Sequence, residues 1–429
     1  TISRQMTEAG FRKVEFDSLA DVYVINTCSV TENADKECRR IVRQVMRKNA
    51  SAEVIIMGCY AQLKPKEIAE IPGVTMVLGA KEKFRLHEFL SLLPDKQRRV
   101  EAQIHSCEIE DVKFFQSSYS FGERTRAFLK VQDGCDYSCT YCTIPLARGS
   151  SRSDNIGHVV KQAELIAELG IKEIVLTGIN LGDFGIQDGK RVESFFELTK
   201  QLETVEGIER FRISSIEPNL LTDEIISFVA QSKKFMPHFH IPLQSGSNKI
   251  LNLMKRRYLR NVFESRVHEI KKQMPHACIG ADVITGFPGE GDEEFLDSFN
   301  FINKLPLSYL HVFTYSERDN TEAALMTDVV PMNIRNNRTK QLRNLSEKKR
   351  HAFYSEHENS VRSVLFESKN ENGMMEGFTD NYIKVEHAFS ESLSNSIQQV
   401  QLINQTDHNM HCSLIKTSQP KSNTALHVS

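Results

Sequence analysis

Short apolar runs alternate with helically spaced segments over the first hundred residues. The runs are 21–27 (DVYVINT) and 54–59 (VIIMGC), and the helical segments are 34–49 and 81–94. This alternation predicts a small parallel α/β sheet. Cys28 and Cys59 each follow a predicted strand, so we expect them at the carboxyl edge, where open α/β sheets bind ligands.

The same alternation continues from residue 126 to about residue 316. The predicted strands are 126–132, 172–177, 210–215, 239–243, 279–284 and 309–315. Helical segments such as 158–169 and 293–304 separate most of them. Six β/α units at this spacing predict a partial (β/α)6 barrel with its functional loops at the carboxyl ends of the strands.

The pattern changes after a basic helix predicted near 335–357. The predicted strands that follow are 361–366, 377–385 and 398–403, with Gly, Asn and Asp between them. They predict a small all-β, OB-like domain, a fold that often binds RNA without proving it. The polar segment 95–124 is predicted to be a linker. The sequence therefore predicts an α/β protein with three domains, at 1–108, 120–350 and 358–422.

Composition narrows the class of protein. The chain has 429 residues, of which 40% are hydrophobic and 26% charged, as expected for a soluble chain of two or three domains. No apolar run approaches the ~20 residues of a membrane span, and the start does not resemble a signal peptide. Nine cysteines without such a signal indicate a reducing, cytoplasmic environment, and they favour metal binding or catalysis over disulfides.

The net charge of −2 does not identify a partner, but two local patches are basic. They are 335–351 and 255–260 (KRRYLR). Such patches can bind the phosphates of a nucleic acid. A solvated helix face is the commoner explanation of any single charge run.

Three cysteines are crowded into one segment, GCDYSCTYC. Cys135, Cys139 and Cys142 have the spacing C-x3-C-x2-C, and no fourth cysteine is near them. A closed zinc site needs four ligands, whereas thiolates at short spacings hold iron–sulfur clusters. Three thiolates would leave one iron of a cubane open to a reactant. The alternatives are a zinc site completed by a distant histidine and a chance grouping.

The segment CDYSCTYC resembles the signature of the radical S-adenosylmethionine (SAM) enzymes. The segments FLKVQDGC, TIPLARG, IVLTGINLGDFG, FRISSIEPN, HIPLQSGSNKIL, MKRRY and ADVITGFPGE resemble the methylthiotransferase branch. More narrowly, they resemble the bacterial enzymes that act on N6-threonylcarbamoyladenosine in tRNA. The segments VINTCSVTENADKECR and GCYAQ are similar to the amino-terminal domain of that family, and the last domain is similar to its RNA-binding TRAM domain.

The resemblance implies two [4Fe–4S] clusters. Cys135, Cys139 and Cys142 would hold the cluster that binds SAM at its open iron. Cys28 and Cys59 match two of the three ligands of an auxiliary cluster. We expect the third ligand upstream of Thr1, because TISRQMTEAGF resembles the middle of a helix. Cys38 could substitute for it, but its helical setting favours an ordinary helix cysteine.

The implied reaction adds a methylthio group to carbon 2 of the modified adenosine at position 37 of tRNA. It consumes two SAM molecules, since a radical can functionalise a carbon that acid–base chemistry cannot. The implied partners are the anticodon loop of tRNA and an electron donor such as flavodoxin or ferredoxin. No membrane partner is expected.

Further residues match the SAM-binding rim of the family. They are Thr177 and Gly178 near the SAM amino group, Ser215 and Glu217 near the ribose, and Gln244, Ser245 and Asp282. Glycine suits the backbone contact at residue 178 because no Cβ blocks it. Each of these residues could equally belong to a structural turn. His238 and His240 are expected to form a structural pair, and Cys107, Cys278 and Cys412 to be structural.

Three alternatives stay open. The substrate could be isopentenyladenosine in tRNA or an aspartate of a ribosomal protein, although TIPLARG, TGINLGDFG and RISSIEPN favour the threonylcarbamoyl substrate. The chain could also be an iron–sulfur protein that binds RNA or carries electrons without catalysis. A three-cysteine cluster argues against an electron carrier, which would gain from closing all four irons.

Overall fold

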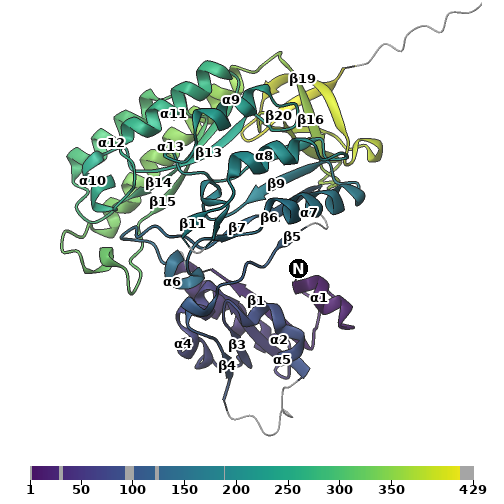
Figure 1. Ribbon diagram of the computed structural model, residues 1–429, viewed down its shortest axis with the longest axis vertical. Coiled ribbons are helices and arrows are strands. Elements are labelled where there is room, and N and C mark those ends of the chain that lie inside the picture. Colours follow the sequence, from purple (N-terminus) through teal and green to yellow (C-terminus); the bar gives the residue numbers. More distant parts are fainter. Residues whose placement is uncertain (1, 29–31, 92–100, 121–124, 188, 416–429) are drawn as a thin grey trace, which may run out of the picture.

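The computed structural model describes residues 2–28, 32–91, 101–120, 125–187 and 189–415 (Figure 1). Its first unit is a parallel sheet with the strand order β1-β2-β3-β4. The strands are β1 (Val22–Thr27), β2 (Glu53–Gly58), β3 (Met76–Leu78) and β4 (Gln103–His105). The small parallel sheet is confirmed. However, β4 falls in the segment 95–124, so the prediction of a plain linker there is wrong.

Helices cover this sheet. They are α1 (Ile2–Glu8), α2 (Glu32–Lys48), α3 (Cys59–Leu63), α4 (Pro65–Ala69) and α5 (Leu86–Ser91). Helix α2 packs because Cys38, Val42 and Val45 share one apolar face that is buried on the sheet. The helix predicted at 81–94 is a 3₁₀ turn (Glu82–Arg85) followed by α5. Its last residues, 92–94, lie outside the described part of the chain.

The second unit contains the six strands that the sequence predicts, with ends that differ by at most a few residues. They are β6 (Arg126–Lys130), β9 (Glu173–Thr177), β12 (Arg210–Ile213), β13 (His238–Gln244), β14 (Cys278–Thr285) and β15 (Tyr309–Thr314). Neighbouring strands pair in parallel, and bridges Phe211–Phe235 and Ser215–His240 join the two halves. A further strand, β5 (Ser118–Ser120), pairs antiparallel with β6.

Helices cover one face of these strands (Figure 1). They are α7 (Ile156–Glu168), α8 (Phe195–Glu203), α9 (Asp223–Gln231), α10 (Asn248–Leu253), α11 (Arg260–Gln273), α12 (Asp292–Lys304) and α13 (Met332–Ser355). Alternate strand residues such as Leu129, Ile174 and Val312 join the main hydrophobic core against these helices. The strand residues that alternate with these core residues lie on the opposite side of the strands, which we call the inner face. No described helix has the length and apolar character of a membrane span.

The third unit is a closed barrel with the strand order β16-β17-β18-β20-β19. The strands are β16 (Val361–Phe366), β17 (Met374–Thr379), β18 (Lys384–Ala388), β19 (Ile397–Gln405) and β20 (Met410–Leu414). An all-β domain is therefore confirmed. The single strand predicted at 377–385 is wrong, because Asp380–Tyr382 form a turn in which Thr379 Oγ donates to Asn381 Oδ1 (2.7 Å).

The β-barrel covers the inner face near the amino ends of the parallel strands. The Arg210 guanidinium donates to Ser363 O (2.8 Å) and Phe378 O (3.0 Å), and that of Arg212 donates to Thr379 O (2.7 Å). Glu173 is fully buried between these two arginines. The amino-terminal unit lies at the opposite end of the strands, so the carboxyl ends face it (Figure 1).

The basic segment 335–351 is only partly available to a phosphate, since Lys340 and Lys348 are exposed but other basic side chains are engaged within the protein. Arg335 and Arg338 are buried and ion-paired, with Glu317 and with Glu290 and Asp292 respectively. Lys349 donates to two backbone carbonyls, and Arg350 pairs with Glu347. Arg335 and Arg338 thereby fix α13 to neighbouring segments, because buried guanidinium groups need such partners, whereas the Arg350 pair lies within the helix.

Candidate active site

The three-cysteine loop follows β6 and is held from both sides. Cys135 N donates to Gly149 O (3.0 Å), and Thr140 N donates to Met254 O (3.2 Å). Gly134 lies at φ +71°, and a Cβ there would come within 2.0 Å of Ser150 O. Only glycine fits this turn, which directs the following loop into the carboxyl ends of the strands.

The three thiols are largely shielded from solvent. Cys139 is buried, and Cys135 and Cys142 are half-buried. Burial raises the pKa of Cys135 to about 12 and that of Cys142 to about 11, and it also raises the pKa of Cys139. Thiolates in such a place need a cation or a metal to stabilise them.

Arg256 supplies one such positive charge. Its Nη1 lies 3.0 Å from Cys139 Sγ, and its Nη2 is ion-paired with Glu217. Both side chains are almost fully buried, and burial raises the pKa of Glu217 despite the neighbouring arginine. Arg256 belongs to KRRYLR, and its burial fits neither of the two interpretations of that patch, a phosphate-binding surface or a solvated helix face. The prediction that Glu217 lies at the site is consistent with this position.

Gln132 connects the cysteine loop to the loop after β9. Its Oε1 accepts hydrogen bonds from Ile179 N (2.8 Å) and Asn180 N (3.0 Å), and its Nε2 donates to Gly134 O (2.8 Å). A Cβ on Gly178 would lie 2.9 Å from Gln132 Oε1, so glycine permits this close approach. Gln132 thereby fixes Thr177 and Gly178 beside the cysteine loop.

Cys28 and Cys59 leave the amino-terminal sheet side by side. The residues before them, Thr27 and Gly58, are register partners at the carboxyl ends of β1 and β2. This confirms the predicted position of both cysteines at the carboxyl edge of the sheet. Helix α3, which begins at Cys59, contacts α6 (Ile144–Arg148) of the second unit. Arg148 Nε lies 3.4 Å from Cys59 Sγ.

A hollow of about 490 Å³ lies between the two units. Asn26, Met57, Lys83 and Phe84 line it from the first unit, and Lys130, Gln132, Asp133, Arg148, Thr177 and Gly178 line it from the second. Burial lowers the pKa of Lys83 to about 8 and also lowers that of Lys130. The hollow is lined by three basic side chains, Lys83, Lys130 and Arg148, and one acidic side chain, Asp133, which favours an anionic occupant.

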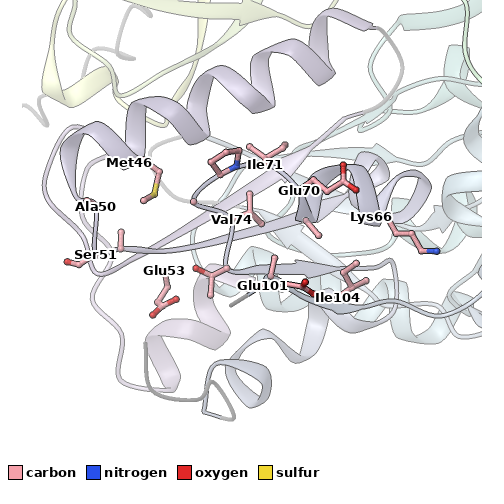
Figure 2. A pocket seen from close by; sticks show the side chains of 16 residues that line it. Met46, Ala50, Ser51, Glu53, Lys66, Glu70, Ile71, Val74, Glu101 and Ile104 are labelled. Atoms are coloured by element: carbon pink, nitrogen blue, oxygen red, sulfur yellow. The ribbon is translucent and has the colours of Figure 1, made fainter. Parts of the chain in front are cut away.

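A second hollow, of about 690 Å³, lies in the first unit, at the amino ends of the strands of its sheet (Figure 2). Its lining includes Ala52, Glu53 and Thr75, which lie at or before the starts of β2 and β3, and it contains no cysteine or histidine. Despite its size it is remote from the chemistry, since both cysteines of the sheet lie at the opposite edge.

The remaining residues predicted to line the SAM site differ in their burial and in their hydrogen-bond partners. Ser215 and Gln244 are half-buried at the carboxyl ends of their strands, and Gln244 has φ +65°. Ser245 is buried, and its Oγ accepts from Ser247 N (3.2 Å), so it shapes its own turn. Asp282 lies deeper and is paired with His240 and His311. Its carboxylate is engaged there, so we do not retain it among the SAM contacts.

The other cysteines pack in hydrophobic surroundings or hold turns. Cys38 is buried on the sheet side of α2, as expected for an ordinary helix cysteine. Cys412 is buried in the core of the third unit, and Cys278, at the start of β14, joins the same hydrophobic cluster from the second unit. Cys107 O accepts from Gln62 Nε2 (2.9 Å), and burial raises the pKa of its thiol.

The residues present fit an iron–sulfur cluster with an additional ligand. The donor set at the strand ends consists of three thiols, the ligand type that such clusters use. Arg256 Nε and Asn219 Oδ1 are buried there without a hydrogen-bond partner among the described residues. Such groups are stabilised when a polar ligand fills the site.

Sequence analysis missed several residues of this site. Gln132, Arg148 and Arg256 stand inside the quoted segments FLKVQDGC, TIPLARG and MKRRY, but their partners lie up to about a hundred residues away. Gln132 and Arg148 could have been found from the sequence, because both lie within a few residues of the three-cysteine segment. Arg256 gave no such signal, because it lies 117 residues from Cys139.

Comparisons with known proteins agree with this geometry. The model of the Radical SAM superfamily matches residues 129–302, and that of the Uncharacterized protein family UPF0004 matches residues 1–79. A solved structure of the radical SAM methyltransferase TsrM from Kitasatospora setae aligns with a TM-score of 0.53. It has 15% identity and covers 73% of this chain and 64% of that one, which indicates a shared fold.

Curated relatives match over most of the chain. The threonylcarbamoyladenosine tRNA methylthiotransferase MtaB of Bacillus subtilis is 40% identical over 92% of this chain and 88% of its own. The enzyme of the same name from Aquifex aeolicus is 38% identical, over 90% and 92%. The tRNA-2-methylthio-N(6)-dimethylallyladenosine synthase of Natranaerobius thermophilus is 30% identical, over 88% and 85%. This chain belongs to the radical SAM family of tRNA methylthiotransferases.

Proposed function

We propose that this protein methylthiolates carbon 2 of N6-threonylcarbamoyladenosine in tRNA, at the position next to the anticodon. The observation that carries the proposal is the meeting of two cysteine-bearing segments from different structural units. Arg148 ends the helix that follows Cys135, Cys139 and Cys142, and its Nε lies 3.4 Å from Cys59 Sγ. Cys28 follows the strand that pairs with the strand before Cys59, and the hollow between the two units is lined by Arg148. The MtaB relatives, which bear the name of this activity, are more similar than the dimethylallyladenosine synthases.

We assign each of the three structural units to one domain of a radical SAM methylthiotransferase. Residues 1–108 form the auxiliary-cluster domain, 120–350 a partial (β/α)6 radical SAM barrel, and 358–422 a TRAM domain. The order of the six parallel strands and the closed five-stranded barrel support this division. Strand β5 pairs with β6 and extends the second unit to residue 118.

The cysteines would hold two [4Fe–4S] clusters, one at Cys135, Cys139 and Cys142 and an auxiliary one at Cys28 and Cys59. When bound, the first cluster and SAM supply the radical chemistry that an unactivated ring carbon requires. The chain's own task is positioning. Gln132 fixes the backbone at Thr177 and Gly178, where the SAM amino group would bind, and Arg256 offsets thiolate charge at Cys139.

Other rim residues are assigned to SAM by position. Glu217 and Ser215 stand at the end of β12, within reach of the cysteine loop through Arg256, and Gln244 and Ser245 stand at the end of β13. Glu217 is already paired with Arg256, so its contribution to SAM binding is shared with that guanidinium.

The proposed partners follow from the substrate. An adenosine of the anticodon loop is unpaired and can be splayed into a protein site at modest cost. A donor of the flavodoxin or ferredoxin type would reduce the cluster in the cytoplasm. The C-terminal β-barrel is the proposed RNA-binding element, and Arg335 and Arg338 of α13 are engaged within the protein.

Analysis of tRNA nucleosides tests the substrate. Mass spectrometry of tRNA from a strain that lacks this protein should show N6-threonylcarbamoyladenosine without its 2-methylthio derivative, and the gene should restore the derivative. Loss of 2-methylthio-isopentenyladenosine instead would assign the other tRNA substrate. Unchanged tRNA with an unmodified ribosomal-protein aspartate would assign the protein substrate. Absence of 5′-deoxyadenosine formation from SAM and reductant would support the non-catalytic alternative.

A further inference from the structure

Three potential metal ligands meet on the inner face, below the proposed SAM rim. His240, Asp282 and His311 come from the adjacent strands β13, β14 and β15, and each offers one donor atom within 4.8 Å of the others. Asp282 and His311 are register partners. The strand neighbours of His311, Leu310 and Val312, pack in the helix-covered core, so the three donors lie on the opposite face.

The donor atoms are spaced like the ligands of one small cation. Asp282 Oδ1 lies 2.9 Å from His240 Nε2 and 3.5 Å from His311 Nδ1. A metal bound at about 2.0–2.1 Å separates tetrahedral or octahedral ligands by about 3.0–3.4 Å. An ion could therefore enter with small side-chain shifts and without backbone movement.

The surroundings orient these ligands. Tyr309 Oη lies 3.3 Å from His240 Nδ1 and 3.0 Å from His238 Nε2. It is therefore the hydrogen-bond partner of the His240 ring nitrogen that does not face Asp282. Metal-bound histidines commonly have such a partner on their second nitrogen. Burial alone would raise the pKa of Asp282, but hydrogen bonds with His240 and His311 hold it well below its usual range.

We propose that His240, Asp282 and His311 bind one divalent transition-metal ion of the zinc or ferrous class. Two imidazoles and one carboxylate are the donors that such ions favour, whereas Mg²⁺ and Ca²⁺ favour oxygen ligands throughout. Three protein ligands leave coordination positions free. Solvent or a small ligand can reach these positions, because the His311 side chain is 56% exposed. The site contains no cysteine and is separate from both cluster sites.

Zinc binding to the cluster-loaded protein tests the proposal. The protein is dialysed anaerobically against Zn²⁺, and the zinc bound per chain is measured by elemental mass spectrometry. We expect His311→Ala and Asp282→Asn to bind one zinc fewer than the unchanged protein. His158→Ala is the matched control. His158 and Asp154 form a similar pair, 2.7 Å apart, but the described residues provide no third donor beside it.

Two results would overturn the proposal. One is equal zinc binding by the unchanged protein and His311→Ala, which would leave a purely hydrogen-bonded triad. The other is zinc X-ray absorption showing a sulfur-only shell, which would place the metal on cysteines. A nitrogen and oxygen shell that His311→Ala removes supports the site. Tyr309→Phe should bind zinc roughly 10-fold more weakly, since it removes only the outer partner of His240.

Discussion

Arg148 Nε lies 3.4 Å from Cys59 Sγ, although the two residues belong to different structural units. Arg148 closes the short helix that follows the three-cysteine loop, and Cys59 begins the helix that follows β2. The same guanidinium bonds Asp133 (3.1 Å) beside the loop. One side chain therefore connects the surroundings of both proposed clusters and fixes how the two units face each other.

Arg148→Ala should separate the two halves of the reaction. We expect formation of 5′-deoxyadenosine from SAM to persist, while the methylthiolated product falls by about 10- to 100-fold, the usual cost of removing a partner of a metal ligand. Arg85→Ala is the control, because Arg85 is exposed and pairs only locally with Glu88. Equal loss of SAM cleavage and product would contradict a role centred on Cys59.

Substituting the cysteines should also separate SAM cleavage from formation of the methylthiolated product. Any one of Cys135→Ala, Cys139→Ala and Cys142→Ala should abolish 5′-deoxyadenosine formation. Cys28→Ala and Cys59→Ala should retain it but stop sulfur insertion. Cys38→Ala, buried in the helix, serves as the control and should retain product formation. Chromatography of the nucleosides and of 5′-deoxyadenosine measures both steps.

Arg256→Leu should destabilise the fold, because it leaves the buried Glu217 carboxylate unpaired. The expected loss is about 3–5 kcal/mol in the free energy of unfolding, measured by urea denaturation of the cluster-free protein. The double variant Arg256→Leu/Glu217→Gln should recover part of that loss. Lys255→Ala, the adjacent residue in an exposed pair with Glu322, should cost less than about 1 kcal/mol.

Thiol reactivity in the cluster-free protein should depend on pH. Burial raises the pKa of Cys135 to about 12 and of Cys142 to about 11, so both are protonated near neutrality. Their alkylation should rise about tenfold per pH unit between pH 7.5 and 9.5, since only the thiolate reacts. Protonation of these thiols favours folding below the unfolded pKa of about 8.5, and the stabilisation is lost as the pH rises toward 11–12. Peptide mass spectrometry measures each site, and a pH-independent rate would contradict the prediction.

Glu173→Gln should loosen the C-terminal β-barrel. Burial would raise the pKa of Glu173, but Arg212 and Arg210 lower it overall. Its stabilisation is present above the unfolded pKa of about 4.3 and is lost as the pH falls through the lower folded value. We expect a loss of about 3–5 kcal/mol and faster proteolysis near Val361. Glu164→Gln, on the exposed side of α7, should behave like the unchanged protein.

The sequence by itself determined most of the local elements and the proposed cluster ligands. Leu129 and Ile174 stand in short runs rich in apolar and β-branched residues, and this local pattern predicts strands from neighbouring residues alone. The spacing of Cys135, Cys139 and Cys142 is equally local. The error at 377–385 arose where a turn at Asn381 interrupts a β-rich run.

Only the tertiary structure decided which charges are available and which distant residues meet. The basic run 335–351 looks like a phosphate surface in the sequence, but Arg335 and Arg338 are buried and paired with Glu317 and Glu290. Arg256 joins Cys139, and His240 joins Asp282 and His311, through strand order and register. Contacts between residues far apart in the chain depend on long-range packing, which local periodicity does not encode.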